Sequence, residues 1–223
     1  MFKGVDEKLE RAGYFLNNLK TLADDAGGFP YIKRDKQQEV RANLDGFFFE
    51  IISAKDFFLQ GINDKYANLP KDEATRIDNL KRCLGCLRSA DALNIVESIE
   101  KELSNKGSWL WELNNYRNSA THRELIPLAH EAEAHLITED KQLFDKIRQG
   151  RVVIKPIFAG QEKEIPPEVP RVDIPRENIK SYLFKDPEDP SKGRADIEVI
   201  PYCEQSLERM RTFLEELYSE LSI

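Results

Sequence analysis

Long apolar runs are missing from this 223-residue sequence, and none approaches the length of about 20 residues that a bilayer-spanning helix needs. Residues 1–6 also lack the hydrophobic stretch of a signal peptide. With 40% apolar residues, the chain nevertheless has enough of them to build a packed core. We therefore expect a globular, cytosolic protein that does not associate with membranes.

Cysteine is scarce, and three in 223 residues are too few for a disulfide framework, which fits a reducing compartment. Cys83 and Cys86 have the Cys-x-x-Cys spacing, but the sequence has no second pair to complete a zinc site. Because they lie in an apolar helical stretch, we interpret them as buried packing residues, with a redox or metal role as the alternative. We expect no metal and no cofactor.

The sequence has no surplus of positive charge. Its 33 basic and 40 acidic residues give a net charge of −7, which argues against broad, sequence-blind DNA binding. The most basic local stretch is residues 141–155, and we interpret it as a solvated helix face that runs into a strand. Contact with nucleic acid is the alternative for its five cations: Lys141, Lys146, Arg148, Arg151 and Lys155.

Apolar residues recur at alternating steps of four and three, the period of an amphipathic helix. The first such stripe runs from Val5 to Ala23 and stops before two glycines, which predicts a helix end there. A second stripe, from Val40 to Ile62, is widened by further Phe and Ile residues, which predicts a helix at the centre of a bundle. Further helices are predicted from residue 70 to a break at 89–91, from 108 onwards, over 139–149 and over 207–221.

Eight of the eleven prolines lie between Pro156 and Pro201, which excludes a continuous helix there. Strands are predicted over residues 152–158, 179–185 and 195–202, the last two forming a hairpin. The predicted fold is mainly α, with a helical bundle over residues 1–150, a proline-rich antiparallel β insertion over 151–202 and a C-terminal helix over 203–223. The last helix is too short to fold alone, so we expect it to pack back on the bundle and form one domain.

Two stretches contain the chain's histidines. His130 and His135 lie five residues apart, whereas four would place both on one helix face, so we predict a solvated helix or loop and no metal site. The other stretch, Arg117 to His122, combines a permanent cation, an amide and an imidazole. It follows Ser108, a predicted N-cap, and a predicted buried stripe of Trp109, Leu113, Tyr116 and Ala120.

On a continuous helix, Asn114, Asn118 and His122 share one face, and Arg117 is long enough to reach round to it. A single anion could contact all four side chains. On composition alone, the alternative is an exposed helix end whose arginine and histidine have no joint role.

The pattern Arg117-Asn118-x-x-x-His122, near the end of a late helix in an all-α bundle, resembles the signature of the HEPN superfamily, the higher eukaryotes and prokaryotes nucleotide-binding domain. Aromatic residues precede the motif, and a bundle of suitable length surrounds it. The resemblance covers roughly Val5 to Gln149 and the terminal helix, while residues 151–202 have no counterpart in the minimal family fold.

The resemblance implies a metal-independent endoribonuclease that cuts single-stranded or loop RNA, in a toxin, antiphage or RNA-processing role. The RNA 2′-hydroxyl would attack the adjacent phosphorus and leave a 2′,3′-cyclic phosphate and a 5′-hydroxyl. His122 would transfer protons, Arg117 would neutralise the phosphorane, and Asn118 would orient either the histidine or the phosphate. We assign RNA binding to three neighbours: Asn114, Thr121 and Arg123.

The resemblance also implies a homodimer, because family members pair about a twofold axis that brings two motifs into one cleft. An antitoxin or a nucleotidyltransferase is the kind of protein partner that the family suggests. The alternative function is a catalytically silent HEPN-like module that binds a nucleotide, RNA or a protein partner.

Overall fold

The computed structural model describes residues 1–122, 128–132, 135–137, 171–173, 179–185 and 194–221. The chain divides into two compact units, Met1–Ala129 with Tyr182–Ile223, and His130–Ser181. The first unit is mainly helical and holds the candidate motif. In the second, β2 (His135–Ile137) pairs antiparallel with β3 (Arg171–Asp173).

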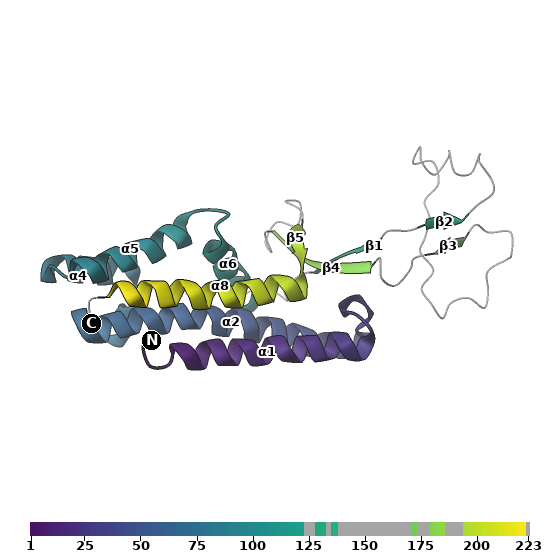
Figure 1. Cartoon of the computed structure of the whole chain (residues 1–223), viewed down its shortest axis with the longest axis horizontal. Helices are drawn as coiled ribbons and strands as arrows, with labels where there is room; N and C mark the ends of the chain where they lie inside the picture. The colour runs from purple at the N-terminus through teal and green to yellow at the C-terminus, as the bar shows by residue number, and fades with distance from the viewer. Residues whose placement is uncertain (123–127, 133–134, 138–170, 174–178, 186–193, 222–223) are drawn as a thin grey trace. The chain divides into compact units, whose positions relative to one another are not determined.

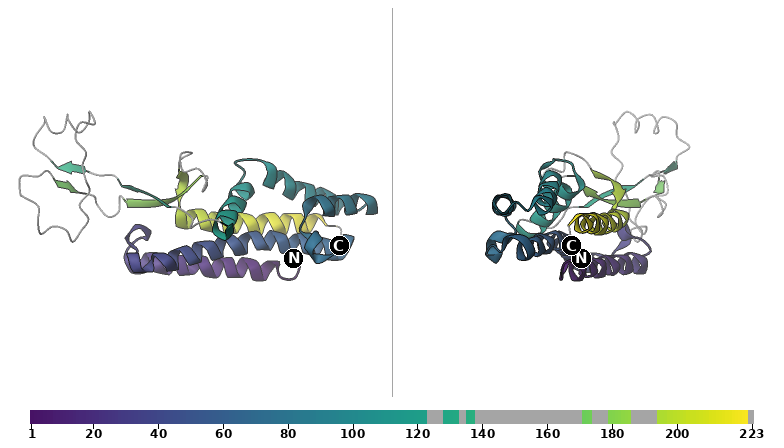
Figure 2. Two further views of the ribbon diagram at one scale, coloured as in Figure 1. Left: turned by 180° about the vertical axis from the view of Figure 1, so that it is seen from behind. Right: turned by 60° about the vertical axis from the view of Figure 1, so that its left-hand side comes forward.

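Three long helices of the first unit lie side by side and contact one another: α1 (Val5–Ala26), α2 (Gln37–Ile62) and α8 (Val199–Glu220) (Figures 1 and 2). The predicted stripe of α1 is its buried face, and the helix ends at Gly27, whose left-handed φ of 76° lets its N–H bond the last carbonyls. The central position predicted for α2 is confirmed, because it contacts α6 as well as α1 and α8.

Glycines bring aromatic rings close to the backbone of α2. A Cβ atom at Gly46 would lie 2.7 Å from the ring of Phe15 on α1, and one at Gly61 would overlap the ring of Phe2. The Phe2 ring also meets the rings of Phe58 and Tyr218 at centroid distances of 5.3 and 5.1 Å. The Phe15 ring thus fills a space beside α2 that only glycine leaves, and it brings α1 close to α2 at this point.

An enclosed ion pair also joins α1 to α2. Lys8 Nζ lies 2.7 Å from Glu50 Oε2, and only 13% and 11% of the two side chains are exposed. The ammonium group also lies over the rings of Phe49 and Phe57.

The remaining helices of this unit are α4 (Ile77–Leu87), α5 (Ala90–Ser104) and α6 (Trp109–His122), and α6 packs against both α5 and α2. Short elements connect the helices: 3₁₀ turns η1 (Phe29–Tyr31) and η2 (Arg34–Lys36), the π-helical turn η3 (Asn63–Ala67), and α3 (Lys71–Ala74).

The burial predicted for Cys83 and Cys86 is wrong. The buried face of α4 consists of Leu80 and Leu84, and each residue along a helix turns about 100° from the last. Cys83 therefore lies at the edge of the buried face and is half-buried, whereas Cys86 lies on the outer side and is exposed.

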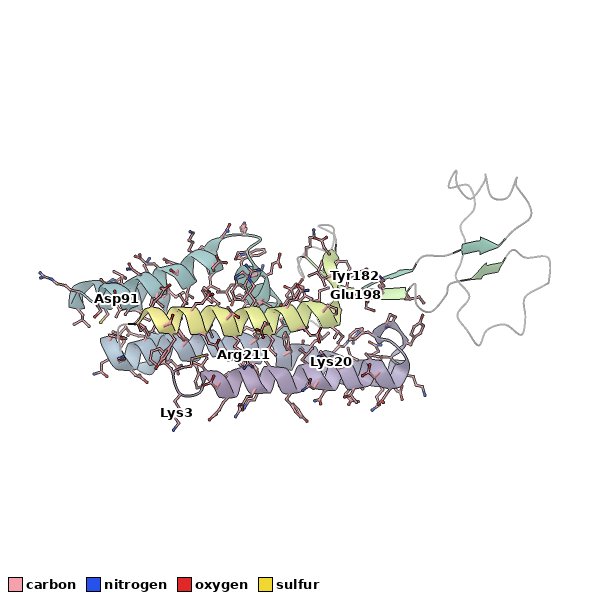
Figure 3. The ribbon with its side chains drawn as sticks, in the orientation of Figure 1. Lys3, Lys20, Asp91, Tyr182, Glu198 and Arg211 are labelled. Carbon is pink, nitrogen blue, oxygen red and sulfur yellow. The ribbon has the colours of Figure 1, made fainter. Side chains whose placement is uncertain are left out.

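The strand pair before the C-terminal helix is confirmed. β4 (Ile179–Phe184) pairs antiparallel with β5 (Arg194–Glu198), and Tyr182 lies opposite Glu198 (Figure 3). β4 is the middle strand of the order β1-β4-β5, with β1 at Leu128–Ala132. The final helix begins at Val199, earlier than predicted, because Pro201 falls in its first turn, where a missing N–H costs nothing.

His130 and His135 do not lie in a helix or loop as predicted, because they belong to strands β1 and β2. The mixture of small, polar and apolar residues around them is compatible with a strand as well as with the predicted helix or loop. The helix predicted over 139–149, the strand predicted over 152–158 and the basic stretch 141–155 lie outside the described residues.

Candidate functional site

The motif is carried by α6, a single helix from Trp109 to His122. Ser108 caps it as predicted: the Trp111 N–H donates to Ser108 Oγ over 3.3 Å, and the Ser108 hydroxyl donates to the Glu102 carbonyl. Because the helix is continuous, its backbone places Asn114, Asn118 and His122 on one face.

Tyr116 fixes how α6 is turned. Its side chain is 1% exposed, its ring lies 4.9 Å from Phe48 of α2 and 5.9 Å from Tyr202 of α8, and its hydroxyl donates to the Phe184 carbonyl of β4. An enclosed aromatic side chain with a satisfied hydroxyl is a strong anchor. The neighbouring Arg117 is therefore held against α2.

Arg117 lies between two oxygen acceptors. Its Nη1 donates to Asn118 Oδ1 over 3.2 Å, and its Nη2 lies 3.7 Å from Asp56 Oδ2 on α2. The Arg117 side chain is 27% exposed, so solvent reaches the guanidinium although the residue packs against α2. The structure thus brings the predicted Arg117 and Asn118 together and adds the carboxylate of Asp56 from α2.

Asp56 also pairs with the preceding residue, Lys55, whose Nζ lies 2.7 Å from Asp56 Oδ1. Lys55, Asp56 and Arg117 thus bring charges of both signs together where α2 meets α6. One feature of the sequence could have indicated that Lys55 and Asp56 belong to the site. They are adjacent charged residues inside the apolar helix α2, and charges are rarely buried without a partner.

The other predicted site residues are described less fully. Asn114 is half-buried on α6. Thr121 and His122 belong to the last turn of α6, but their side chains lie outside the described part of the chain, and Arg123 lies wholly outside it.

The start of α6 corrects the predicted buried stripe. Trp109 is half-buried and meets the Phe213 ring of α8 at 5.5 Å, with the Arg209 guanidinium 4.9 Å above it. Leu110 is fully buried in its place. The helical spacing predicts Trp109 as a member of the stripe, but an indole beside an arginine is stable at a half-exposed edge.

A polar contact also joins α6 to α8, between Glu112 and Tyr202. The Tyr202 hydroxyl donates to Glu112 Oε2 over 3.4 Å. Burial raises the pKa of the Glu112 carboxyl, while this hydrogen bond and the charges of Lys185 and Arg209 act in the opposite direction. Burial also raises the pKa of the Tyr202 hydroxyl, which keeps it a donor.

Comparisons with protein-family models, with curated protein sequences and with solved structures found no match to this chain. Among the described residues, no three His, Cys, Asp or Glu side chains gather as metal ligands would. None of the described helices combines the length and apolar composition needed to span a bilayer.

Proposed function

We propose that this chain is a HEPN-like, metal-independent endoribonuclease whose reactive groups lie at the end of α6. The observation that carries the proposal is the placement of Arg117, which is 27% exposed and lies beside Asn118 on the helix that ends with His122. A positioned guanidinium keeps its charge throughout the reaction and suits a crowded, doubly negative phosphorane.

In the proposed reaction, His122 transfers a proton and Arg117 stabilises the transition state, while Asn118 holds the guanidinium through its side-chain oxygen. Lys55 adds a second cation nearby and pairs with Asp56. RNA is the proposed substrate because attack by a 2′-hydroxyl needs a ribose, and single-stranded RNA supplies the necessary freedom.

The direct test is incubation of the full chain with end-labelled RNA in the presence of EDTA. We expect fragments with 2′,3′-cyclic phosphate and 5′-hydroxyl ends, no cutting of the matched DNA, and a loss of cleavage of about 100-fold or more in Arg117→Ala and His122→Ala. Arg211→Ala is the matched control, because Arg211 is an exposed arginine on α8 (Figure 3). Equal cleavage by all four proteins would contradict the proposal.

A second candidate is a catalytically silent RNA-binding module, and the Asp56 carboxylate favours it. A carboxylate 3.7 Å from the Arg117 guanidinium competes with phosphate for the same cation. Protection of RNA without cutting would support this module. In that case Asp56→Asn should bind RNA about three- to tenfold more tightly at low salt, because one repulsive charge is removed.

We also propose that the enzyme works as a twofold dimer, since one imidazole cannot be both the acid and the base of a single step. Wild-type and His122→Ala chains can be mixed, allowed to exchange and assayed for cleavage. If the two motifs share a cleft, an equal mixture should keep about one quarter of the activity, whereas independent sites keep about one half. Tagged chains would confirm the exchange.

A further inference from the structure

Cys83 and Cys86 form an accessible pair of thiols in the last two turns of α4. Cys86 is exposed, and Cys83 is half-buried with its thiol donating to the Ala67 carbonyl over 3.7 Å. The third thiol, Cys203 of α8, is completely buried. A reagent in solution therefore meets Cys86 first and does not reach Cys203.

Helix geometry allows a bond between the two accessible thiols. Residues three apart in an α-helix have Cα atoms about 5 Å apart, within the range of about 4.4 to 6.8 Å seen in disulfides. Their Cβ atoms are about 5 to 6 Å apart, however, and a relaxed disulfide needs about 3.5 to 4.5 Å. The bond can close only with a small local movement, and a bond closed in this way is readily reduced.

The end of α4 can accommodate this movement. Gly85 lies between the two cysteines, and a Cβ atom there would meet nothing within 4 Å, so no neighbour opposes a local change on this outer side of α4, while Leu84 on the inner side is fully buried. The helix ends at Leu87, one residue beyond Cys86, and Arg88 follows in the left-handed region with a φ of 57°. Adjustment can therefore take place in the last two turns of α4, which hold both cysteines.

The surroundings of Cys86 suit an anionic reagent. Arg82 is exposed one turn before Cys86 on the same side of the helix, and Arg88 is exposed just beyond it. Low-molecular-weight disulfides such as oxidised glutathione carry several carboxylates, which these cations complement. Among the described residues no third His, Cys, Asp or Glu joins the pair, so a closed zinc site within one chain has no donor set.

We propose that Cys83 and Cys86 are a reversible dithiol–disulfide pair that exchanges with low-molecular-weight disulfides. The Cys86 thiolate attacks one sulfur of the small disulfide, forms a mixed disulfide and releases one small thiol. Cys83 then attacks the Cys86 sulfur and releases the second small thiol. The protein loses two protons and two electrons, and the small disulfide gains them.

Closure also removes the thiol proton that Cys83 donates to Ala67 in the π-helical turn η3. The oxidised chain should therefore exchange backbone amide hydrogens faster around residues 63–69, where η3 and α4 meet. Oxidation of the pair thus changes one contact, that between Cys83 and η3, and does not constrain other helices.

The test uses the full, reduced chain with oxidised glutathione, followed by trapping with an alkylating agent and peptide mass spectrometry. The wild type and Cys203→Ser should lose the mass of two hydrogen atoms through a bond between Cys83 and Cys86, and excess reduced glutathione should reverse it. Cys83→Ser should stop at one glutathione attached to Cys86. Cys86→Ser should react at about one tenth of the wild-type rate or below, because its remaining accessible thiol, Cys83, is half-buried.

Three results would overturn the proposal. The wild type could keep a glutathione adduct without closing the ring, both thiols could stay reduced at every ratio of oxidised to reduced glutathione, or the purified chain could retain stoichiometric zinc that protects both thiols. Serine should not disturb folding at the exposed position 86 or at the half-buried position 83, and circular dichroism of each variant checks this.

Discussion

α2 contacts α1 on one side and α6 on the other, and the two contacts are built differently. Against α1 it presents glycines whose open sides are occupied by aromatic rings. It also presents an ion pair whose two side chains are only 13% and 11% exposed. Against α6 it presents Phe48 and then a group of charges in which Arg117 and Asp56 are 27% and 23% exposed. The first contact holds the helices together, and the second holds charged groups firmly while solvent still reaches them.

Phe47→Ala, in the core of α2, should have the largest effect on stability. The ring is completely buried in the middle of α2, so its removal should leave a cavity and lower the free energy of unfolding by about 3 to 5 kcal/mol. Chemical denaturation followed by circular dichroism measures this loss. Phe49→Ala is the matched control, because Phe49 is 42% exposed on the same helix, and its cost should be much smaller.

Glu50→Gln should have the next largest effect. The change keeps the shape of the side chain but leaves the enclosed Lys8 ammonium without its carboxylate, which should cost about 1.5 to 3 kcal/mol of unfolding free energy. Glu204→Gln provides the comparison, because the ion pair of Glu204 with Lys20 is 46% and 38% exposed. Equal losses in the two variants would show that enclosure does not strengthen the Lys8–Glu50 pair.

Arg117→Ala should lower stability by about 1 kcal/mol or less, since Asp56 keeps Lys55 as a partner. Its loss of RNA cleavage should therefore occur in a folded protein. A thermal melt of the variant beside the cleavage assay separates the two effects. A variant that unfolds would place Arg117 with the structural contacts of α2 and remove it from the candidate site.

Glu112→Gln should have the smallest effect, and it should depend on pH. Because burial raises the pKa of Glu112 in the folded chain, the carboxyl favours folding while it is protonated, and this benefit is lost as pH rises through the raised pKa. Glutamine stays neutral, so the variant should be slightly more stable than wild type at neutral pH. The difference should vanish below the ordinary glutamate pKa, and denaturation at several pH values measures it.

The sequence predicts the helices well where apolar residues repeat regularly. The stripe from Val5 to Ala23 and the central place of α2 depend only on helical period, and the structure confirms both. Burial of single residues is harder to predict, because one position along a helix decides whether a side chain faces inward. Cys86 and Trp109 show this, since Cys86 lies two residues after the fully buried Leu84 and Trp109 lies directly before the fully buried Leu110.

The candidate site was predictable only in part. Arg117 and Asn118 follow from a local pattern, and they lie together as neighbours on α6 must. Asp56 and Lys55 approach them from α2, and no feature near the motif indicates which distant residues will pack there. The roles assigned to all the predicted site residues remain predictions, as does the resemblance to the HEPN superfamily.

The ring of Phe15 occupies the space in which a side chain at position 46 would begin. A larger residue at 46 therefore requires either that the Phe15 ring move away or that the residue at 15 become smaller. Positions 15 and 46 should accordingly covary in an alignment of related chains. The same coupling offers a way to test a proposed relative: a chain that keeps this fold with a bulky residue at the position of Gly46 should lack an aromatic residue at the position of Phe15.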